Sequence, residues 1–218
     1  CHHLGYWIGV NVRHLRDGRP DRLPHRRDTI MKSIFTALRM LVVLTILTGV
    51  IYPLVVTLAA QAVFPAQANG SLETRDSVVV GSSLIGQNMN SNPRYFWSRP
   101  SAINYSPLPS SGSNLGPTNA TLAETVVERA DAFRVANGLP EDAPVPTDVL
   151  FASGSGLDPH ISPETARLQV ARIAAARGLS VEQVSGLVDA AIEAPQLAFL
   201  GQPRVNVLLL NLALDSLQ

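Results

Sequence analysis

Asp158 and His160 lie two positions apart in the sequence and bring together a carboxylate and an imidazole. Such a pair can exchange a proton or bind a metal ion. Two ligands alone make a weak metal site, because zinc sites in proteins use three or four protein ligands. We therefore expect no metal at this position. A hydrolase that uses Asp158 and His160 stays open as an alternative.

The stretch Ala152–Pro163 also carries Gly154 and Gly156, and a glycine-rich loop can cradle phosphate. A P-loop needs Gly-Lys-Ser/Thr at a fixed spacing after its first glycine, and that sequence does not follow here. A tight turn before a helix capped by Ser162 fits the residues better, with a phosphate cradle or a partner-contact loop as alternatives. The G-x-S-x-G pattern of a nucleophile elbow is also missing. We expect no catalytic residue.

Two further groups of side chains could bind partners. Arg167, Arg172 and Arg177 recur every five residues, and about 100° per residue spreads them around a helix, which favours a solvated, salt-bridged surface over an anion-binding stripe. Tyr95–Trp97, flanked by arginines, has the composition of an interface anchor and equally that of a half-buried strand. The candidate partner contacts in the chain after residue 64 are Tyr95, Trp97, Arg99, Asp158 and His160.

The element that must position these residues is the apolar stretch Met40–Phe64. It contains no charged residue, and more than half of it is Leu, Ile, Val or Phe. At about 1.5 Å per residue it is long enough to cross a hydrocarbon core of about 30 Å. A cleaved signal peptide has a shorter apolar region, of about 7–15 residues. We interpret residues 40–64 as one transmembrane helix, kinked at Pro53.

Small and hydroxyl-bearing residues interrupt this span and suit it to packing against other membrane helices. The candidate packing residues are Thr45, Gly49, Pro53 and Thr57. The alternative is a plain anchor exposed to membrane lipid.

Charge is divided unevenly on the two sides of the span, although the whole chain has a formal net charge of zero. Residues 1–39 hold eight of the seventeen Lys and Arg and have a net charge of +5, whereas the rest has −5. Positive residues favour the cytoplasmic side. We therefore expect a short cytoplasmic segment at residues 31–39 and an extracytoplasmic domain at residues 65–218. Residues 1–30 do not begin with Met and we interpret them as upstream translation or a mis-called start.

The region after the span should form a single α+β domain. It contains no cysteine, which excludes disulfides, and the chain shows no basic patch for nucleic acid. A hairpin is expected from Ser77–Gly81 and Ser83–Gly86, and short strands at Tyr95–Trp97, Val149–Ala152 and Val205–Leu208. Pro, Ser, Gly and Asn crowd residues 104–119 and predict a loop.

Three helices are expected in the same domain. One runs from a Thr121–Glu124 capping box to Gly138, the second from Ser162 and Pro163 to Gly178, and the third from a Ser180–Gln183 capping box to Pro195. Residues Asn211–Leu217 should form a strand end or a helical turn.

Several motifs, in this order and spacing from about Met31 to the C-terminus, resemble one family. They are Gln67–Leu72, Gly81–Gln87, Tyr95–Ala102, Ser113–Asn119, Ala152–Pro163 and Gly201–Asp215. Together they resemble the C subunit of the bacterial potassium-transporting Kdp ATPase, the KdpC family.

The resemblance implies a non-catalytic, single-pass subunit of the bacterial inner membrane, in an ATP-driven potassium uptake complex. Its partners would be the channel-like A subunit, the P-type ATPase B subunit and the small F subunit. The family is described as a chaperone that raises the ATP affinity of the B subunit, so ATP and K⁺ would be handled by the complex, with no intrinsic cofactor. The charge asymmetry places the domain away from cytoplasmic ATP. The alternatives are a membrane-anchored extracytoplasmic hydrolase or binding module unrelated to the pump, and an inverted topology with a nucleotide-binding cytoplasmic module.

Overall fold

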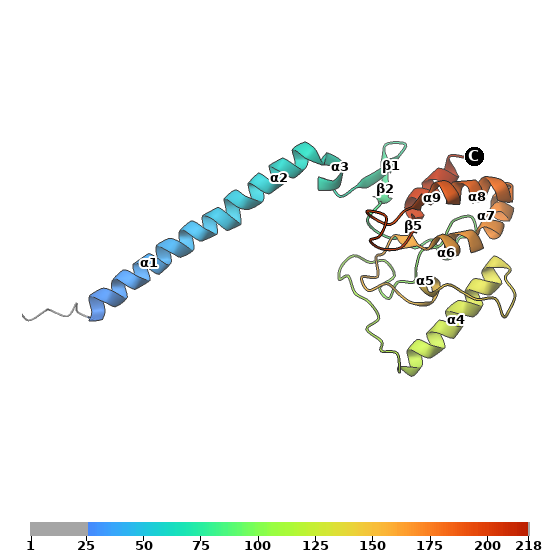
Figure 1. Ribbon diagram of the computed structural model, residues 1–218, viewed down its shortest axis with the longest axis horizontal. Helices are drawn as coiled ribbons and strands as arrows, with labels where there is room; N and C mark the ends of the chain where they lie inside the picture. Colours follow the sequence, from blue (N-terminus) through green and yellow to red (C-terminus); the bar gives the residue numbers. More distant parts are fainter. Residues whose placement is uncertain (1–25, 218) are drawn as a thin grey trace, which may run out of the picture. The chain divides into compact units, whose positions relative to one another are not determined.

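The computed structural model describes residues 26–217, and most of the stretch 1–30 interpreted as an extension lies outside them. The chain divides into two compact units, Cys1–Ala60 and Gln61–Gln218, which are described separately. The structure combines one N-terminal apolar helix with a mixed domain that contains small sheets, which confirms the predicted α+β class (Figure 1).

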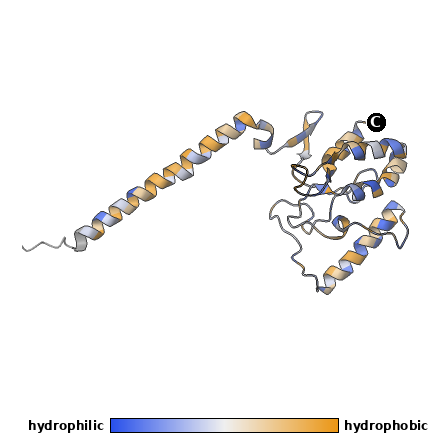
Figure 2. Ribbon diagram, in the orientation of Figure 1, coloured by the Kyte–Doolittle hydropathy of each residue, from blue (hydrophilic) through white to orange (hydrophobic). Residues whose placement is uncertain are grey.

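One long helix carries the apolar stretch. It consists of α1 (Arg26–Ile46), the π-helical segment η1 (Leu47–Ile51) and α2 (Tyr52–Val63). Within the described residues, the structure has one helix long and apolar enough to cross a membrane, Thr29–Val63, with 35 residues. Apolar residues cover most of this helix (Figure 2), and none of its most apolar stretch is buried in the chain. A helix that is apolar all round requires lipid or other helices around it.

The π-helical segment ends at Ile51, two residues before Pro53. Proline has no N–H to give to the carbonyl four residues earlier, at Gly49, and its ring crowds that carbonyl. The wider π turn, in which Tyr52 N–H donates to Leu47 O, accommodates this defect without ending the helix. Thr48 donates its hydroxyl to Leu44 O at 2.7 Å and adds a side-chain bond to the same turn.

The domain begins with α3 (Pro65–Ala68) and a hairpin of β1 (Leu72–Arg75) and β2 (Val78–Ser82). The expected hairpin between residues 77–81 and 83–86 was wrong, because the partner of β2 precedes it. Asp76 and Ser77 make the turn, both with positive φ, as a two-residue type I′ hairpin turn requires. The strand β1 was not predicted, because its sequence is mostly polar and the prediction relied on apolar runs.

The remaining helices and strands form the body of the domain. The helices are α4 (Ala120–Asn137), α5 (Thr147–Leu150), α6 (Pro163–Leu168), α7 (Val170–Arg177), α8 (Val181–Ala190) and α9 (Val207–Asp215). A three-stranded antiparallel sheet has the order β3 (His160–Ile161), β5 (Arg204–Asn206), β4 (Ile192–Glu193). In Figure 1, α8 and α9 lie at one edge of the domain and α4 at the opposite edge.

The hydrophobic core forms where α6 to α9 meet β3 and β5. Its members are apolar and nearly inaccessible to water, and they include Phe96, Ile161, Val170, Ile173, Val184, Val188, Val205, Leu210 and Leu214. Burial of each large side chain contributes about 1.5–3 kcal/mol. The core fixes the frame on which the polar groups described below are arranged.

Several predicted helix boundaries are confirmed. Ser162 caps α6 with Pro163 at its first position, and Ser180 and Gln183 form the capping box of α8. The helices α4 and α7 end at Gly138 and Gly178 in left-handed conformations. The second predicted helix is divided at Gln169 into α6 and α7.

Other local predictions were wrong. Asn119 caps α4 and accepts from Leu122 N–H, so the helix starts before the expected Thr121–Glu124 box. Residues 147–150 form the short helix α5 where a strand was expected at Val149–Ala152. The strand expected at Val205–Leu208 becomes helix at Val207, because Asn206 ends β5 and caps α9.

Candidate partner-contact sites

The segment Tyr95–Arg99 crosses the domain without strand pairing, and side-chain amides take the place of a neighbouring strand. Asn211 accepts from Phe96 N–H at 2.8 Å and donates to Phe96 O at 3.1 Å. Gln169 accepts from Trp97 N–H at 2.8 Å and donates to Trp97 O at 3.4 Å. Both amides are buried. The prediction of a strand at residues 95–97 was therefore wrong. The backbone N–H and carbonyl groups of Phe96 and Trp97 still have hydrogen-bond partners, but these are side-chain amides and not a neighbouring strand.

Arg172 on α7 organises the polar side of this segment. Its guanidinium donates to the carbonyls of Pro93 and Tyr95, at 2.6 and 3.1 Å, and to Gln169 Oε1 at 2.7 Å. It also lies 4.4 Å from the centre of the Trp97 ring, a cation–π distance. Burial lowers the pKa of Arg172 to about 10, because a charged group loses hydration there.

Arg177 and Asp215 form a buried ion pair at the other end of the segment. Arg177 Nη2 donates to Asp215 Oδ1 at 2.6 Å, and the two side chains are 1% and 12% exposed. The Arg177 guanidinium stacks on the Tyr95 ring at 4.7 Å. Asp215 also accepts from the Tyr95 hydroxyl at 3.2 Å and from Arg75 of the hairpin at 2.5 Å. One carboxylate thus connects β1, α7, α9 and the Tyr95 segment.

These contacts correct the prediction that the three arginines of α6 and α7 form a solvated surface. Arg167 does so, with an exposed ion pair to Asp189 at 2.9 Å. Arg172 and Arg177 instead turn inward over Trp97 and Tyr95. The angles around the helix correctly place the three arginines on different sides. They do not show that other parts of the chain cover two of those sides, where Arg172 and Arg177 lie.

Arg99, Asp158 and His160 come together as one cluster. Arg99 Nη1 donates to Asp158 Oδ2 at 2.9 Å. The backbone N–H of His160 donates to Asp158 Oδ1 at 3.0 Å, and the ring Nδ1 of His160 lies 3.3 Å from the same oxygen. Gly86 allows this arrangement, because a Cβ there would lie 2.6 Å from the Asp158 carbonyl oxygen. All three residues line a hollow of about 440 Å³ together with Asp148 and Arg204.

The electrostatics of the cluster stabilise an ionised Asp158. Burial by itself raises the pKa of the carboxyl, but the hydrogen bonds from His160 and the charge of Arg99 outweigh it and lower the pKa below its usual range. A carboxylate already paired with a guanidinium is poorly placed to take a proton from a substrate. Within residues 26–217, no three His, Cys, Asp or Glu side chains group as metal ligands.

The glycine loop Gly154–Gly156 forms a tight turn, as the favoured interpretation predicted. Gly156 N–H donates to Ser153 O at 3.2 Å, and Ser153 N–H donates to Pro100 O. Ser101 donates its hydroxyl to Gly156 O at 2.7 Å. The turn is therefore joined to the residues that follow the Tyr95–Arg99 segment.

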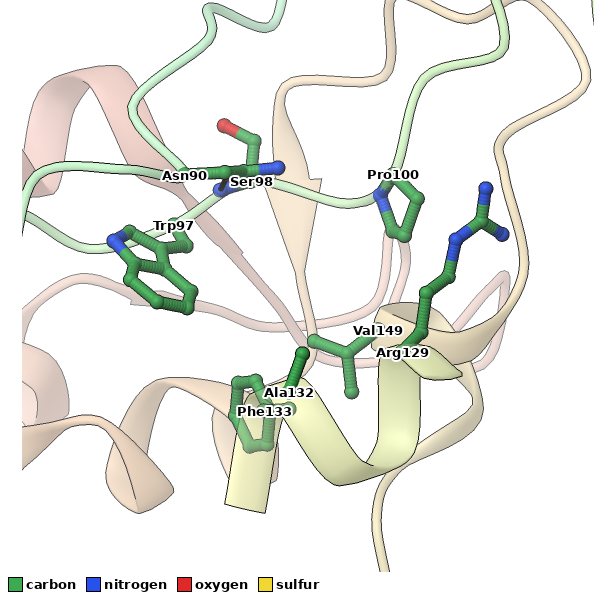
Figure 3. Close-up of a pocket in the computed structure, with 8 residues that line it drawn as sticks. All are labelled: Asn90, Trp97, Ser98, Pro100, Arg129, Ala132, Phe133 and Val149. Carbon is green, nitrogen blue, oxygen red and sulfur yellow. Dashed lines mark hydrogen bonds between the residues drawn. The ribbon is translucent and has the colours of Figure 1, made fainter. Parts of the chain in front are cut away.

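An apolar cavity of about 220 Å³ lies between this segment and α4. Figure 3 shows Phe133, Ala132 and Val149 on one side of it and Asn90, Ser98 and Pro100 on the other, with Trp97 and Arg129 at its ends. Arg129 donates to Leu150 O at 2.7 Å. A space of this size accommodates one or two side chains.

The candidate residues of the span lie along the long helix at steps of four. Thr45, Gly49, Pro53 and Thr57 are all exposed in the chain. Residues four apart form one of the ridges by which helices pack. The ridge is thus free to meet another helix, and its role in packing remains a prediction.

The polar residues that hold the domain together were not predicted from the sequence: Gln169, Asn211, Arg172, Arg177 and Asp215. Asn211 offered one signal, since a polar residue inside the apolar run Val205–Leu214 needs a hydrogen-bond partner when buried. Its partner, Phe96, lies 115 residues away, and no local pattern identifies it.

Comparison with known proteins gives one consistent result. The family model described as K⁺-transporting ATPase, c chain, matches residues 34–216. The potassium-transporting ATPase KdpC subunit of Sorangium cellulosum is 58% identical over 185 residues, which cover 82% of this chain and 95% of the relative. The subunit of the same name from Methylococcus capsulatus is 54% identical, over 84% of this chain and 96% of the relative. That of Geobacter sulfurreducens is also 54% identical, over 86% of this chain and 99% of the relative.

Proposed function

The chain belongs to the KdpC family, the c chains of K⁺-transporting ATPases, and we propose that it acts as a non-catalytic accessory subunit of such a pump. The observation that carries this proposal is the match over residues 34–216, which includes the apolar stretch Met40–Phe64 and all but the last two residues of the domain. ATP hydrolysis then belongs to a partner subunit. The match gives no support to a hydrolase built on Asp158 and His160.

The proposed location is the inner membrane of a bacterium, with the domain on the outer side. The support is the charge pattern: Lys32 and Arg39 precede the apolar stretch, and the residues after it have a net charge of −5. Positive residues near the end of a span favour the cytoplasm. In this orientation K⁺ would approach from the side of the domain.

The proposed partners are the channel-like A subunit, the ATPase B subunit and the small F subunit. The ridge of Thr45, Gly49, Pro53 and Thr57 suits contact with membrane helices of these subunits, because small side chains let helix backbones approach closely. Arg99, Asp158 and His160, partly exposed around their hollow, are the candidate contacts outside the membrane. Tyr95 and Trp97 contribute by fixing the surface around them.

The proposed effect on ATP use is indirect. A domain outside the cytoplasm cannot touch cytoplasmic ATP, so any change in the ATP affinity of the ATPase subunit would pass through the span or through assembly. No intrinsic cofactor is proposed, and K⁺ and ATP are handled by the complex.

Co-purification tests the proposal. The tagged full chain, expressed with the other subunits of its pump, should retain the A and B subunits through affinity purification in detergent. A matched chain whose span is replaced by an unrelated apolar helix should retain less of them. A full-length chain that reaches the membrane and retains no pump subunit would overturn the proposal.

Cysteine labelling tests the orientation. Cys1 is the only cysteine, so a chain with Cys1→Ser and Glu182→Cys carries a single exposed thiol on α8. An impermeant maleimide should label it in spheroplasts before lysis. Labelling only after lysis would place the domain in the cytoplasm.

A further inference from the structure

The connection between β4 and β5 ends in an exposed apolar turn, which we name the tip loop, Gln196–Leu200. Gln196 and Leu200 exchange both backbone hydrogen bonds, at 3.0 and 2.8 Å, and close the turn. Leu197, Phe199 and Leu200 are 77%, 74% and 50% exposed. Three large apolar side chains thus project from one short turn with a fixed backbone.

The backbone of the tip loop is strained. Leu197 and Ala198 both have positive φ, in the left-handed region that favours glycine. Side chains with a Cβ persist there only when the surroundings determine the conformation, and such residues concentrate at binding sites. Ala198 N–H and Phe199 N–H donate to Pro195 O and Gln196 O and hold the turn in place.

Charge is confined to the base of this connection. Glu193 and Arg204 form an ion pair at 2.9 Å where β4 and β5 begin to separate. The stretch between them, Ala194–Pro203, includes no charged side chain. The tip loop therefore presents no charge to a partner, and its three large exposed side chains, Leu197, Phe199 and Leu200, are apolar.

We propose that the tip loop docks into an uncharged, apolar pocket on the extramembrane surface of another subunit of the K⁺-transporting ATPase. The inference rests on the proposed function, because it needs the pump as partner. A protein pocket matches a rigid turn of fixed shape, and aromatic and aliphatic anchors in such pockets carry much of the binding energy. A lipid surface requires no fixed backbone and is usually bound with the help of Lys or Arg, which this loop lacks.

Photo-crosslinking in the assembled pump tests the proposal directly. A benzophenone amino acid in place of Phe199 should crosslink, on irradiation of the purified complex, to another pump subunit identified by mass spectrometry. The matched control is the same group in place of Val135, which is 82% exposed on α4.

Crosslinks to lipid or to a second copy, no crosslink at all, or equal crosslinking from both positions would overturn the docking proposal and leave the proposed function intact. Failure of the unmodified chain to co-purify with the pump would overturn the proposed function and the docking together.

Substitution gives a second test that does not depend on the probe. The double variant Leu197→Ser, Phe199→Ser should fold normally, because both side chains are exposed, yet its retention in the complex should fall about tenfold. The variant Val135→Ser, matched in exposure, should be retained like the native chain. Retention of the double variant at the native level would contradict the proposal.

Discussion

Around the segment Tyr95–Arg99, most buried polar and charged groups find hydrogen-bond partners within the chain, whereas the tip loop carries exposed apolar side chains. Among the described residues, Arg99 Nε and Arg177 Nη1 are the buried side-chain nitrogens that lack a partner. The first region satisfies Phe96 and Trp97 with amides and covers Trp97 and Tyr95 with Arg172 and Arg177. The second satisfies its backbone but leaves Leu197 and Phe199 uncovered. The first region is held mainly by contacts within the chain, and the second is the surface that we propose a second molecule covers.

This difference separates stability from assembly. Substitutions around Tyr95–Arg99 should lower the free energy of unfolding, because they leave buried polar groups unpaired. Substitutions in the tip loop should leave that free energy unchanged and act on binding. The chain has two tryptophans, and in a chain with Trp7→Phe the fluorescence of Trp97 offers a local measure of unfolding in detergent.

Among the variants considered, Asp215→Asn should lower the free energy of unfolding the most. It removes the negative charge that pairs with buried Arg177 and with Arg75. Loss of one partner of a buried ion pair costs about 3–5 kcal/mol of unfolding free energy, measurable by urea denaturation. The control is Asp189→Asn, whose exposed pair with Arg167 is worth at most about 1 kcal/mol. Equal losses in the two variants would contradict the importance assigned to Asp215.

Asn211→Leu should cause the second largest loss of unfolding free energy. The variant keeps a similar volume but leaves the buried N–H and carbonyl of Phe96 without partners, for a loss of about 2–4 kcal/mol in total. Urea denaturation measures the loss. Asn119→Ala, which removes only a helix cap, should lose about 1 kcal/mol. A loss in Asn211→Leu no greater than in the cap variant would show that another group replaces the amide.

Asp158→Asn should have a smaller effect that depends on pH. The folded pKa of Asp158 lies below its usual range, so its contribution is full above the unfolded pKa of about 3.9 and is lost as pH falls through the folded value. The variant should be less stable than the native chain by about 1–2 kcal/mol at neutral pH. Thermal unfolding from pH 7 to pH 3 should show the difference shrinking, and a constant difference would contradict this account.

The double variant Leu197→Ser, Phe199→Ser should change unfolding least, within about 0.5 kcal/mol. Its side chains have few contacts to lose, and the turn keeps its backbone hydrogen bonds. Urea denaturation of native and variant chains should give superimposable curves. A substantial loss would mean that the loop stabilises the domain and would remove the contrast between the two regions.

The same contrast explains which parts of the fold the sequence predicts. The caps at Ser162 and Ser180 and the stops at Gly138 and Gly178 are local signals, and the helices they bound are confirmed. The span follows from composition alone. By contrast, Tyr95–Trp97 has strand-like residues but obtains its pairing from Gln169 and Asn211, which lie 72 and 115 residues away.

The candidate sites show the same limit. Arg99, Asp158 and His160 were selected for their chemistry, and the fold does bring them together. The spacing in sequence could not reveal that Arg99 pairs with Asp158, because the two residues lie 59 positions apart and no local pattern connects them. The tip loop was visible as an uncharged stretch between Glu193 and Arg204, but its exposure depends on the packing of the whole domain.

The central claim is that this chain serves the pump without catalysing its reaction. The most direct measurement is the K⁺-stimulated ATP turnover of the purified pump, prepared with and without the chain. We predict that the preparation without the chain assembles poorly or loses K⁺-stimulated turnover, and that adding back the full chain restores it. Unchanged assembly, K⁺ affinity and ATP turnover without the chain would contradict the account.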